Sequence, residues 1–155
     1  MLMNFLTNAK ANIKGGKMFS NITGTVLFRE TSQGVLVTAK IYNLPQSNTA
    51  CKGRFFGFHI HEGNSCTGDK IDEFKNSKGH LNLNMCPHPF HTGDFPPLLE
   101  SNEYAYSKFL TNKFKISEII GKVIIIHDLP DDFTTHPSGN SGTKIACGVI
   151  YNKRK

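Results

Sequence analysis

The chain has 155 residues and a mass of 17.2 kDa, a size that fits one domain spanning residues 1–155. Its composition, 38% hydrophobic and 19% charged, is sufficient to bury a core and excludes wholesale disorder. The longest apolar run, Val123 to Ile126, is far shorter than the roughly 20 residues that cross a bilayer, so we expect no membrane partner. The formal net charge of +6 attracts anions without identifying one.

Strand signals dominate the chain. We expect a loose N-terminal end over residues 1–8, followed by an initial edge strand at Ala9–Ile13. The alternating, β-branched runs Ile22–Glu30 and Val35–Tyr42 flank turn residues and predict a hairpin. Further strands are expected at Phe55–His61, Tyr104–Leu110, Lys122–His127 and Lys144–Tyr151, and one short helical turn at Ser117-Glu-Ile-Ile. This spacing predicts an all-β sandwich or barrel of about eight strands.

Two long segments lack the alternating pattern that is typical of strands. Gly63–Pro97 is rich in Gly, Asn, Pro and His, and Asp128–Gly142 is rich in Asp, Pro, Ser and Gly. Loops of this length inside a compact domain are usually either functional or disordered. Because the first of them carries three of the seven histidines, we expect the loops to be functional.

The histidines are unevenly distributed. All seven lie between His59 and His136, and five of them lie between His59 and His91. Since histidine is the commonest metal ligand, this clustering favours a metal site over scattered core or surface histidines.

His59 and His61 lie near the end of a predicted strand, where side chains alternate between faces with a period of two. Both imidazoles should therefore point the same way and offer a bidentate site, while Phe58 and Ile60 point into the core. His127 ends another predicted strand, and taken alone it fits a strand-end histidine as well as a ligand.

The first long loop carries His80, His88, His91 and Asp94, at spacings of eight, three and three residues. Three imidazoles and a carboxylate form a reasonable tetrahedral Zn²⁺ set. Asp94 fits a turn residue equally well at this point. Cys86 is a weaker additional candidate, because a thiolate would displace one member of a set that is already full.

Taken together, these motifs resemble copper–zinc superoxide dismutase with bacterial-type spacing. Gly57-Phe-His-Ile-His-Glu-Gly-Asn-Ser-Cys66 is similar to the first signature of the family, and Gly79-His80 to its bridging-histidine motif. His91-Thr-Gly-Asp94 resembles the H-x-G-D motif, and residues 139–150 resemble the C-terminal signature. The resemblance extends from about Ala9 to Tyr151 and implies an eight-stranded, immunoglobulin-like Greek-key barrel or sandwich.

The resemblance also implies a two-metal site that binds Cu²⁺/Cu⁺ and Zn²⁺. The implied copper ligands are His59, His61, His80 and His127, and the implied zinc ligands are His80, His88, His91 and Asp94. Asp131 matches the carboxylate that links a copper histidine to a zinc histidine in the family. Cys66 and Cys147 match the family's intrasubunit disulfide, which leaves Cys51 and Cys86 as free thiols.

The implied reaction is the disproportionation of superoxide, with superoxide anion as the substrate. His80 and Lys144 are the implied catalytic residues: His80 supplies protons, and Lys144 occupies the position of the arginine that docks superoxide. Lysine keeps the charge but lacks the planar fork of arginine, so we expect a slower enzyme. The second departure is a shortened zinc loop, which makes His88 the least certain of the implied ligands.

Two other hypotheses about the function remain. A homologue that binds zinc or copper without turnover is favoured by Lys144 and the short loop, and opposed by the complete set of copper histidines. A nucleic-acid-binding barrel rests only on net charge and the basic tail Lys153-Arg-Lys155, which has no aromatic stacking platform beside it. We therefore expect no nucleic-acid partner.

The N-terminus, MLMNFLTNAKANIKGGK, shows no secretory signal, so we expect a cytoplasmic protein, or a periplasmic or secreted one if the sequence is trimmed. The resemblance leaves both a monomer and a homodimer open.

Overall fold

The computed structural model describes residues 8–153. The strands are β1 (Asn8–Gly15), β2 (Thr23–Thr31), β3 (Gly34–Tyr42), β4 (Phe55–Phe56), β5 (Phe58–His61), β6 (Leu98–Leu99), β7 (Tyr104–Thr111), β8 (Val123–His127) and β9 (Lys144–Asn152). One α-helix, α1 (Ile116–Ile119), and two 3₁₀ turns (Lys17–Phe19 and Lys75–Ser77) accompany them. No helix in this part of the chain is long and apolar enough to span a membrane.

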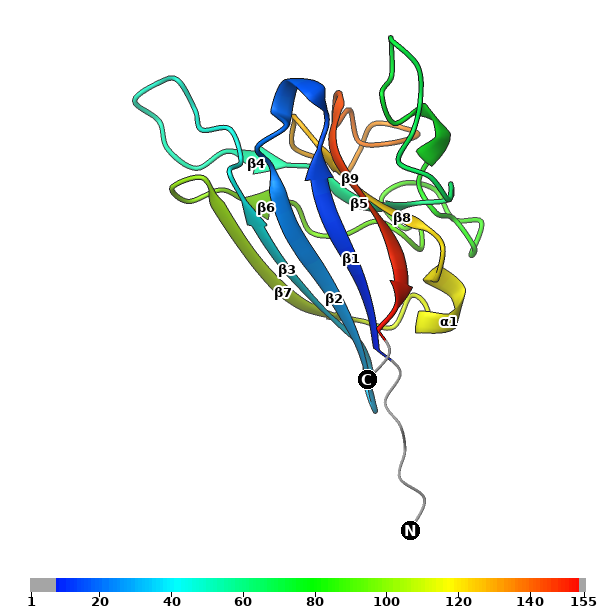
Figure 1. Cartoon of the computed structure of the whole chain (residues 1–155). Coiled ribbons are helices and arrows are strands. Elements are labelled where there is room, and N and C mark those ends of the chain that lie inside the picture. The colour runs from blue at the N-terminus through cyan, green and yellow to red at the C-terminus, as the bar shows by residue number, and fades with distance from the viewer. Residues whose placement is uncertain (1–7, 154–155) are drawn as a thin grey trace.

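Seven strands form one curled antiparallel sheet in the order β5-β8-β9-β1-β2-β3-β7, and β4 pairs with β6 in a second, two-stranded sheet (Figure 1). Alternate side chains of the long strands point inward, so that Val26, Phe28, Val37 and Ile41 are fully buried in one core. The all-β barrel or sandwich expected from the sequence is confirmed.

The expected edge position of the first strand is wrong. β1 lies inside the sheet, where it pairs with β2 on one side and with β9 on the other. Its alternating burial reports only which face turns inward, and it carries no information about how many neighbours the strand has. Of the expected loose end at residues 1–8, Asn8 opens β1 and residues 1–7 lie outside the described part.

The predicted strand Phe55–His61 is two strands that change partner at Gly57. The Gly57 N–H donates to the Leu129 carbonyl at 2.8 Å, and its own carbonyl accepts from the His127 N–H at 2.9 Å. A Cβ at Gly57 would lie 2.8 Å from Cβ of Ser141, so only glycine allows this approach of the second loop. The short β6 was not expected, and α1 begins one residue earlier than the predicted turn.

Two long loops join β5 to β6 and β8 to β9, and they project from the same part of the barrel (Figure 1). The predicted disulfide between Cys66 and Cys147 is present and ties the first loop to β9. Phe74 of that loop packs with Val123, Ile125 and Cys147 in a small second apolar cluster. The loops are therefore anchored against β8 and β9.

Candidate metal centre

β5 and β8 place the strand histidines of the centre. The two strands are antiparallel neighbours, with His59 opposite Ile125 and His61 opposite Val123. Phe58 and Ile60 point into the main core, so the two imidazoles lie on the other face.

The first loop places the remaining histidines by pairing with the free edge of β5. The Ile60 N–H donates to the Gly93 carbonyl at 2.9 Å, and the Leu81 N–H donates to the Ile60 carbonyl at 2.8 Å. These bonds set His80 beside His61 and Asp94 beside His59. A loop that is long in sequence is thus held against the strand that carries the H-x-H motif.

Four histidines converge on one point. One ring nitrogen from each of His59, His61, His80 and His127 lies within 4.8 Å of the others, and all four residues are buried. These are the four copper ligands implied by the resemblance.

Backbone carbonyls orient two of these rings. His61 Nδ1–H donates to the Lys78 carbonyl at 2.8 Å, and His127 Nδ1–H donates to the Gly142 carbonyl at 3.2 Å. Each Nε2 then carries a lone pair, and the two Nε2 atoms lie 3.3 Å apart. Two facing lone pairs repel each other unless a cation lies between them, so this geometry suits a metal ion.

Asp131 joins the two halves of the centre. One of its oxygens accepts from His59 Nε2–H at 2.6 Å, and the other accepts from His88 Nε2–H at 2.9 Å. These bonds fix the tautomer of both rings, so that each Nδ1 carries a lone pair and no proton. Gly139, at φ +70°, makes room for this contact, because a Cβ there would lie 1.9 Å from Asp131 Oδ1 and 2.7 Å from His88 Nε2.

The second group of ligands lies next to the first. His80, His88, His91 and Asp94 each present one ligand atom within 4.8 Å of the others. Asp94 contacts Nδ1 of all three histidines, at 2.7, 3.1 and 3.2 Å respectively. Its carboxylate also accepts from the His91 N–H at 3.0 Å, so Asp94 both closes the turn and faces the site. The short spacing between His88 and His91 therefore does not keep His88 away.

His80 belongs to both groups. Its Nδ1 contacts Asp94 Oδ1, whereas its Nε2 is buried without a hydrogen-bond partner, and its ring lies 3.9 Å from that of His59, centroid to centroid. If both groups held an ion, this one imidazole would be a ligand in each of them.

The residues present fit copper and zinc. The buried ring nitrogens that lack a hydrogen-bond partner include His59 Nδ1, His80 Nε2, His88 Nδ1 and His91 Nδ1. Buried polar atoms are almost always paired, so a set of converging lone pairs without hydrogen-bond partners fits the coordination of a cation. Imidazole suits both copper and zinc, and the carboxylate completes a set typical of zinc.

Burial keeps the rings available as neutral ligands. Desolvation lowers the pKa of His59 to about 4 and that of His127 to about 3, and it holds the pKa of His61 well below its usual range. Desolvation alone would raise the pKa of Asp131, but hydrogen bonds from His59, the Phe133 N–H and His88 keep it well below its usual value. The protein thus holds the neutral His59 ring against the ionised Asp131 carboxylate.

Lys144 begins β9 opposite His127, at the border of the centre, but its ammonium is turned toward the first loop. Nζ donates to Asp72 Oδ2 at 2.9 Å and to the Phe74 carbonyl at 3.3 Å, and the side chain is 15% exposed. A cavity of about 510 Å³ lies beside this ion pair. Sequence reasoning did not predict Asp72 as the partner of Lys144, because the two residues lie 72 positions apart in the chain.

Lys113 is a second contact that the sequence did not predict. It follows β7, and its Nζ donates to the carbonyls of His91 at 3.1 Å and Asp94 at 3.2 Å. It therefore clamps the turn that carries two members of the second group. No side-chain pattern signals a bond to a backbone carbonyl.

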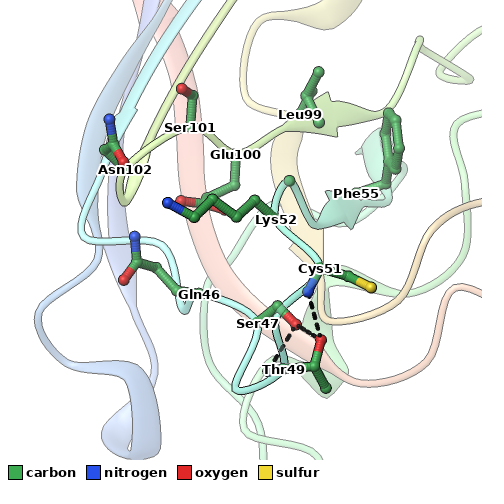
Figure 2. Close-up of a pocket in the computed structure, with 11 residues that line it drawn as sticks. Gln46, Ser47, Thr49, Cys51, Lys52, Phe55, Leu99, Glu100, Ser101 and Asn102 are labelled. Atoms are coloured by element: carbon green, nitrogen blue, oxygen red, sulfur yellow. Dashed lines mark hydrogen bonds between the residues drawn. The ribbon is translucent and has the colours of Figure 1, made fainter.

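The remaining cysteines stay apart from both groups. Cys86 hydrogen-bonds to the Asn84 carbonyl and is not a member of either ligand set in residues 8–153. Cys51 is free and lines a cavity of about 560 Å³ with Lys52, Phe55 and Leu99, among others (Figure 2). None of the clustered histidines lines that cavity.

Comparison with known proteins agrees with this geometry. The family model described as copper/zinc superoxide dismutase matches residues 22–150. The chain is 31% identical to superoxide dismutase 2 (Cu-Zn) of Aquifex aeolicus, over 94% of this chain and 89% of that protein. It is also 31% identical to the superoxide dismutase-like protein YojM of Bacillus subtilis, over 70% of this chain and 62% of that protein.

A solved structure is similar as well. A double mutant of a SOD-like protein from Bacillus subtilis superposes with a TM-score of 0.73 at 29% identity, covering 92% of this chain and 96% of that one. With the match over residues 22–150, this shows that the chain belongs to the copper/zinc superoxide dismutase family.

Proposed function

We propose that this protein disproportionates superoxide, converting two superoxide anions and two protons into O₂ and hydrogen peroxide. The observation that carries the proposal is the convergence of unpaired, buried ring nitrogens into two adjacent groups that share His80. A protein that bound zinc alone would need only His80, His88, His91 and Asp94, and the other three histidines of the centre would have no ion to bind. Copper bound by His59, His61, His80 and His127 would supply the one-electron redox chemistry.

The other residues of the centre position these ligands. Asp131 holds the His59 and His88 rings in one tautomer, and the Lys78 and Gly142 carbonyls do the same for His61 and His127. The second group, closed by Asp94, would hold zinc and fix the His80 ring. His80 Nε2 is the atom at which the proposal places the proton delivered to the reduced substrate.

Lys144 is the cation that we assign to superoxide docking. Its ammonium is paired with the Asp72 carboxylate, so an anion bound near His127 would compete with that carboxylate for it. Since a paired lysine attracts an anion less than a free one, we expect docking to be weaker than with an unpaired cation.

That ion pair also favours the second candidate function, a family member that binds zinc or copper without turnover. The relative named as superoxide dismutase-like rather than as a dismutase points the same way. The complete set of four histidines around the first group favours the enzyme.

Metal analysis combined with rapid kinetics distinguishes the two. Protein expressed with ample copper should contain about one copper and one zinc per chain and should consume superoxide in a stopped-flow assay. His61→Ala should lose copper and activity, whereas His136→Ala, which changes the one histidine outside both groups, should lose neither. Zinc without copper in the wild-type protein, or bound metals without turnover, would support the binding protein instead.

A further inference from the structure

The outer face of β1, β2, β3 and β7 carries an unusual set of side chains. The outward positions of these strands align in four rows: Lys14, Thr23, Tyr42 and Tyr104; Asn12, Thr25, Lys40 and Tyr106; Lys10, Leu27, Thr38 and Lys108; and Asn8, Arg29, Leu36 and Leu110. We call these residues the basic tyrosine face. The alternate positions of the same strands fill the core, so the rows share one side of the sheet.

This face has cations and no acids. Its five charged side chains are Lys10, Lys14, Arg29, Lys40 and Lys108. Within the described residues none of the five forms an ion pair. The face therefore gathers five of the chain's 18 lysine and arginine side chains with no acidic side chain among them.

Tyrosines lie among the cations. Tyr42 and Tyr104 are cross-strand partners with ring centroids 5.0 Å apart, and Tyr106 follows in the next row beside Lys40. Tyr42 and Tyr106 are 46% and 54% exposed, so their rings are open to a ligand. No element overlies β1, β2 and β3 on the side turned to the viewer (Figure 1).

From this arrangement we infer that the basic tyrosine face binds single-stranded nucleic acid. Lysine and arginine pair with the phosphates, and exposed aromatic rings stack on unpaired bases, which is how antiparallel sheets in other proteins hold single strands. Four strands and four rows cover roughly 14 Å by 20 Å, room for about four nucleotides. A second copy of this chain is a poor occupant, because two such faces would bring like charges together.

The inference is independent of the metal centre. β9 separates β1 from the histidine-bearing strands β8 and β5 in the sheet order, and no ligand histidine lies on the face. The C-terminal basic tail has no aromatic stacking platform beside it, and on that ground the sequence alone predicts no nucleic-acid partner. The sheet brings together lysines and tyrosines that lie up to 98 residues apart in the sequence, from Lys10 to Lys108.

The test is fluorescence anisotropy of a labelled ten-nucleotide oligothymidylate titrated with the full chain. We expect binding at low salt, with a logarithmic salt slope approaching about −3.5 if all five cations contact phosphate. Tyr106→Leu should weaken binding about tenfold while Tyr106→Phe keeps it, because the ring stacks and the hydroxyl is not needed. Lys40→Gln with Lys108→Gln should make the slope shallower by about 1.4.

The matched control is Lys52→Gln with Lys70→Gln, which removes the same charge from two exposed loop positions. Retained binding by this control supports the assignment to the face, and an equal loss contradicts it. Heparin and vesicles of anionic phospholipid are the competing probes. If either binds as tightly as the oligonucleotide with no dependence on Tyr106, or if the wild type does not bind the oligonucleotide at low salt, the inference is wrong.

Discussion

The ammonium of Lys144 lies 2.9 Å from the carboxylate of Asp72. The cation that borders the histidine cluster is therefore neutralised by a residue of the disulfide-bonded loop. The other Asp72 oxygen accepts from the Phe74 N–H at 3.0 Å, so this carboxylate is held in place from both sides.

Releasing this ion pair should speed the reaction. Asp72→Asn keeps an oxygen for the Phe74 N–H and removes the charge that holds Lys144, so we expect the superoxide rate constant to rise about threefold, a small gain beside the roughly 10- to 1,000-fold that electrostatic steering can contribute. The rate should also become more sensitive to ionic strength. Pulse radiolysis at two salt concentrations measures both.

The matched control is Asp69→Asn, in the same loop, which breaks the exposed ion pair with Lys75 instead. An equal gain in both variants would mean that general charge, and not the freedom of Lys144, sets the rate. Lys144→Arg should also raise the rate constant, since arginine offers more donors than the carboxylate occupies. An unchanged constant would show that this side chain does not dock the substrate.

Asp131 should control metal affinity without touching a metal. An amide at this position has one acceptor oxygen, so Asp131→Asn can no longer accept from both His59 and His88. We expect affinity to fall 10- to 100-fold, the usual effect of losing such a partner, as measured by chelator competition. Asp132→Asn changes the exposed neighbour and should leave affinity unaltered. Equal effects of the two substitutions would contradict this role.

Lys113 should preorganise the zinc turn. Lys113→Met removes the two hydrogen bonds to the His91 and Asp94 carbonyls and leaves every ligand in place. We expect zinc affinity to fall about tenfold and Lys113→Arg to restore most of it. The control, Lys115→Met, removes an exposed cation two residues away. An unchanged zinc affinity in Lys113→Met would show that the turn at His91–Asp94 keeps its conformation without Lys113.

The metal-free protein should lose stability in mild acid. Burial lowers the pKa of His59 to about 4 and of His127 to about 3, so these rings stay neutral in the folded state while the unfolded chain takes up protons near pH 6.5. The unfolded state then binds more protons, and the free energy of unfolding falls by about 1.4 kcal/mol per pH unit for each histidine between pH 6.5 and 4.

Denaturant unfolding of chelator-treated protein at pH 7 and pH 5 measures this loss. His136→Ala should show the same pH dependence, because that exposed histidine lies outside the centre. A free energy of unfolding that does not change between the two pH values would mean that the ligand histidines are already protonated in the folded state.

Local periodicity explains what the sequence could predict. The common face of His59 and His61 follows from the alternation of a strand, and the order of motifs indicated which loop residues join them. The disulfide followed from the family pattern and is present. These features depend on short stretches of chain or on a matched motif.

Contacts between distant segments explain what could not be predicted. The Lys78 and Gly142 carbonyls orient His61 and His127, and a backbone carbonyl has no residue signature. The pairing of Lys144 with Asp72 spans 72 residues, and the position of β1 depends on strand order. In each case the contact depends on how distant segments are arranged in the fold. Hydrophobic alternation within one segment does not predict that arrangement.

Anomalous diffraction at the copper and zinc absorption edges, on crystals of protein expressed with both metals, tests the shared metal centre most directly. We predict one copper ion among His59, His61, His80 and His127, and one zinc ion among His80, His88, His91 and Asp94, with the His80 ring contacting both. Zinc in both positions, copper in neither, or a His80 ring that contacts only one ion would contradict the two-metal centre proposed for this protein.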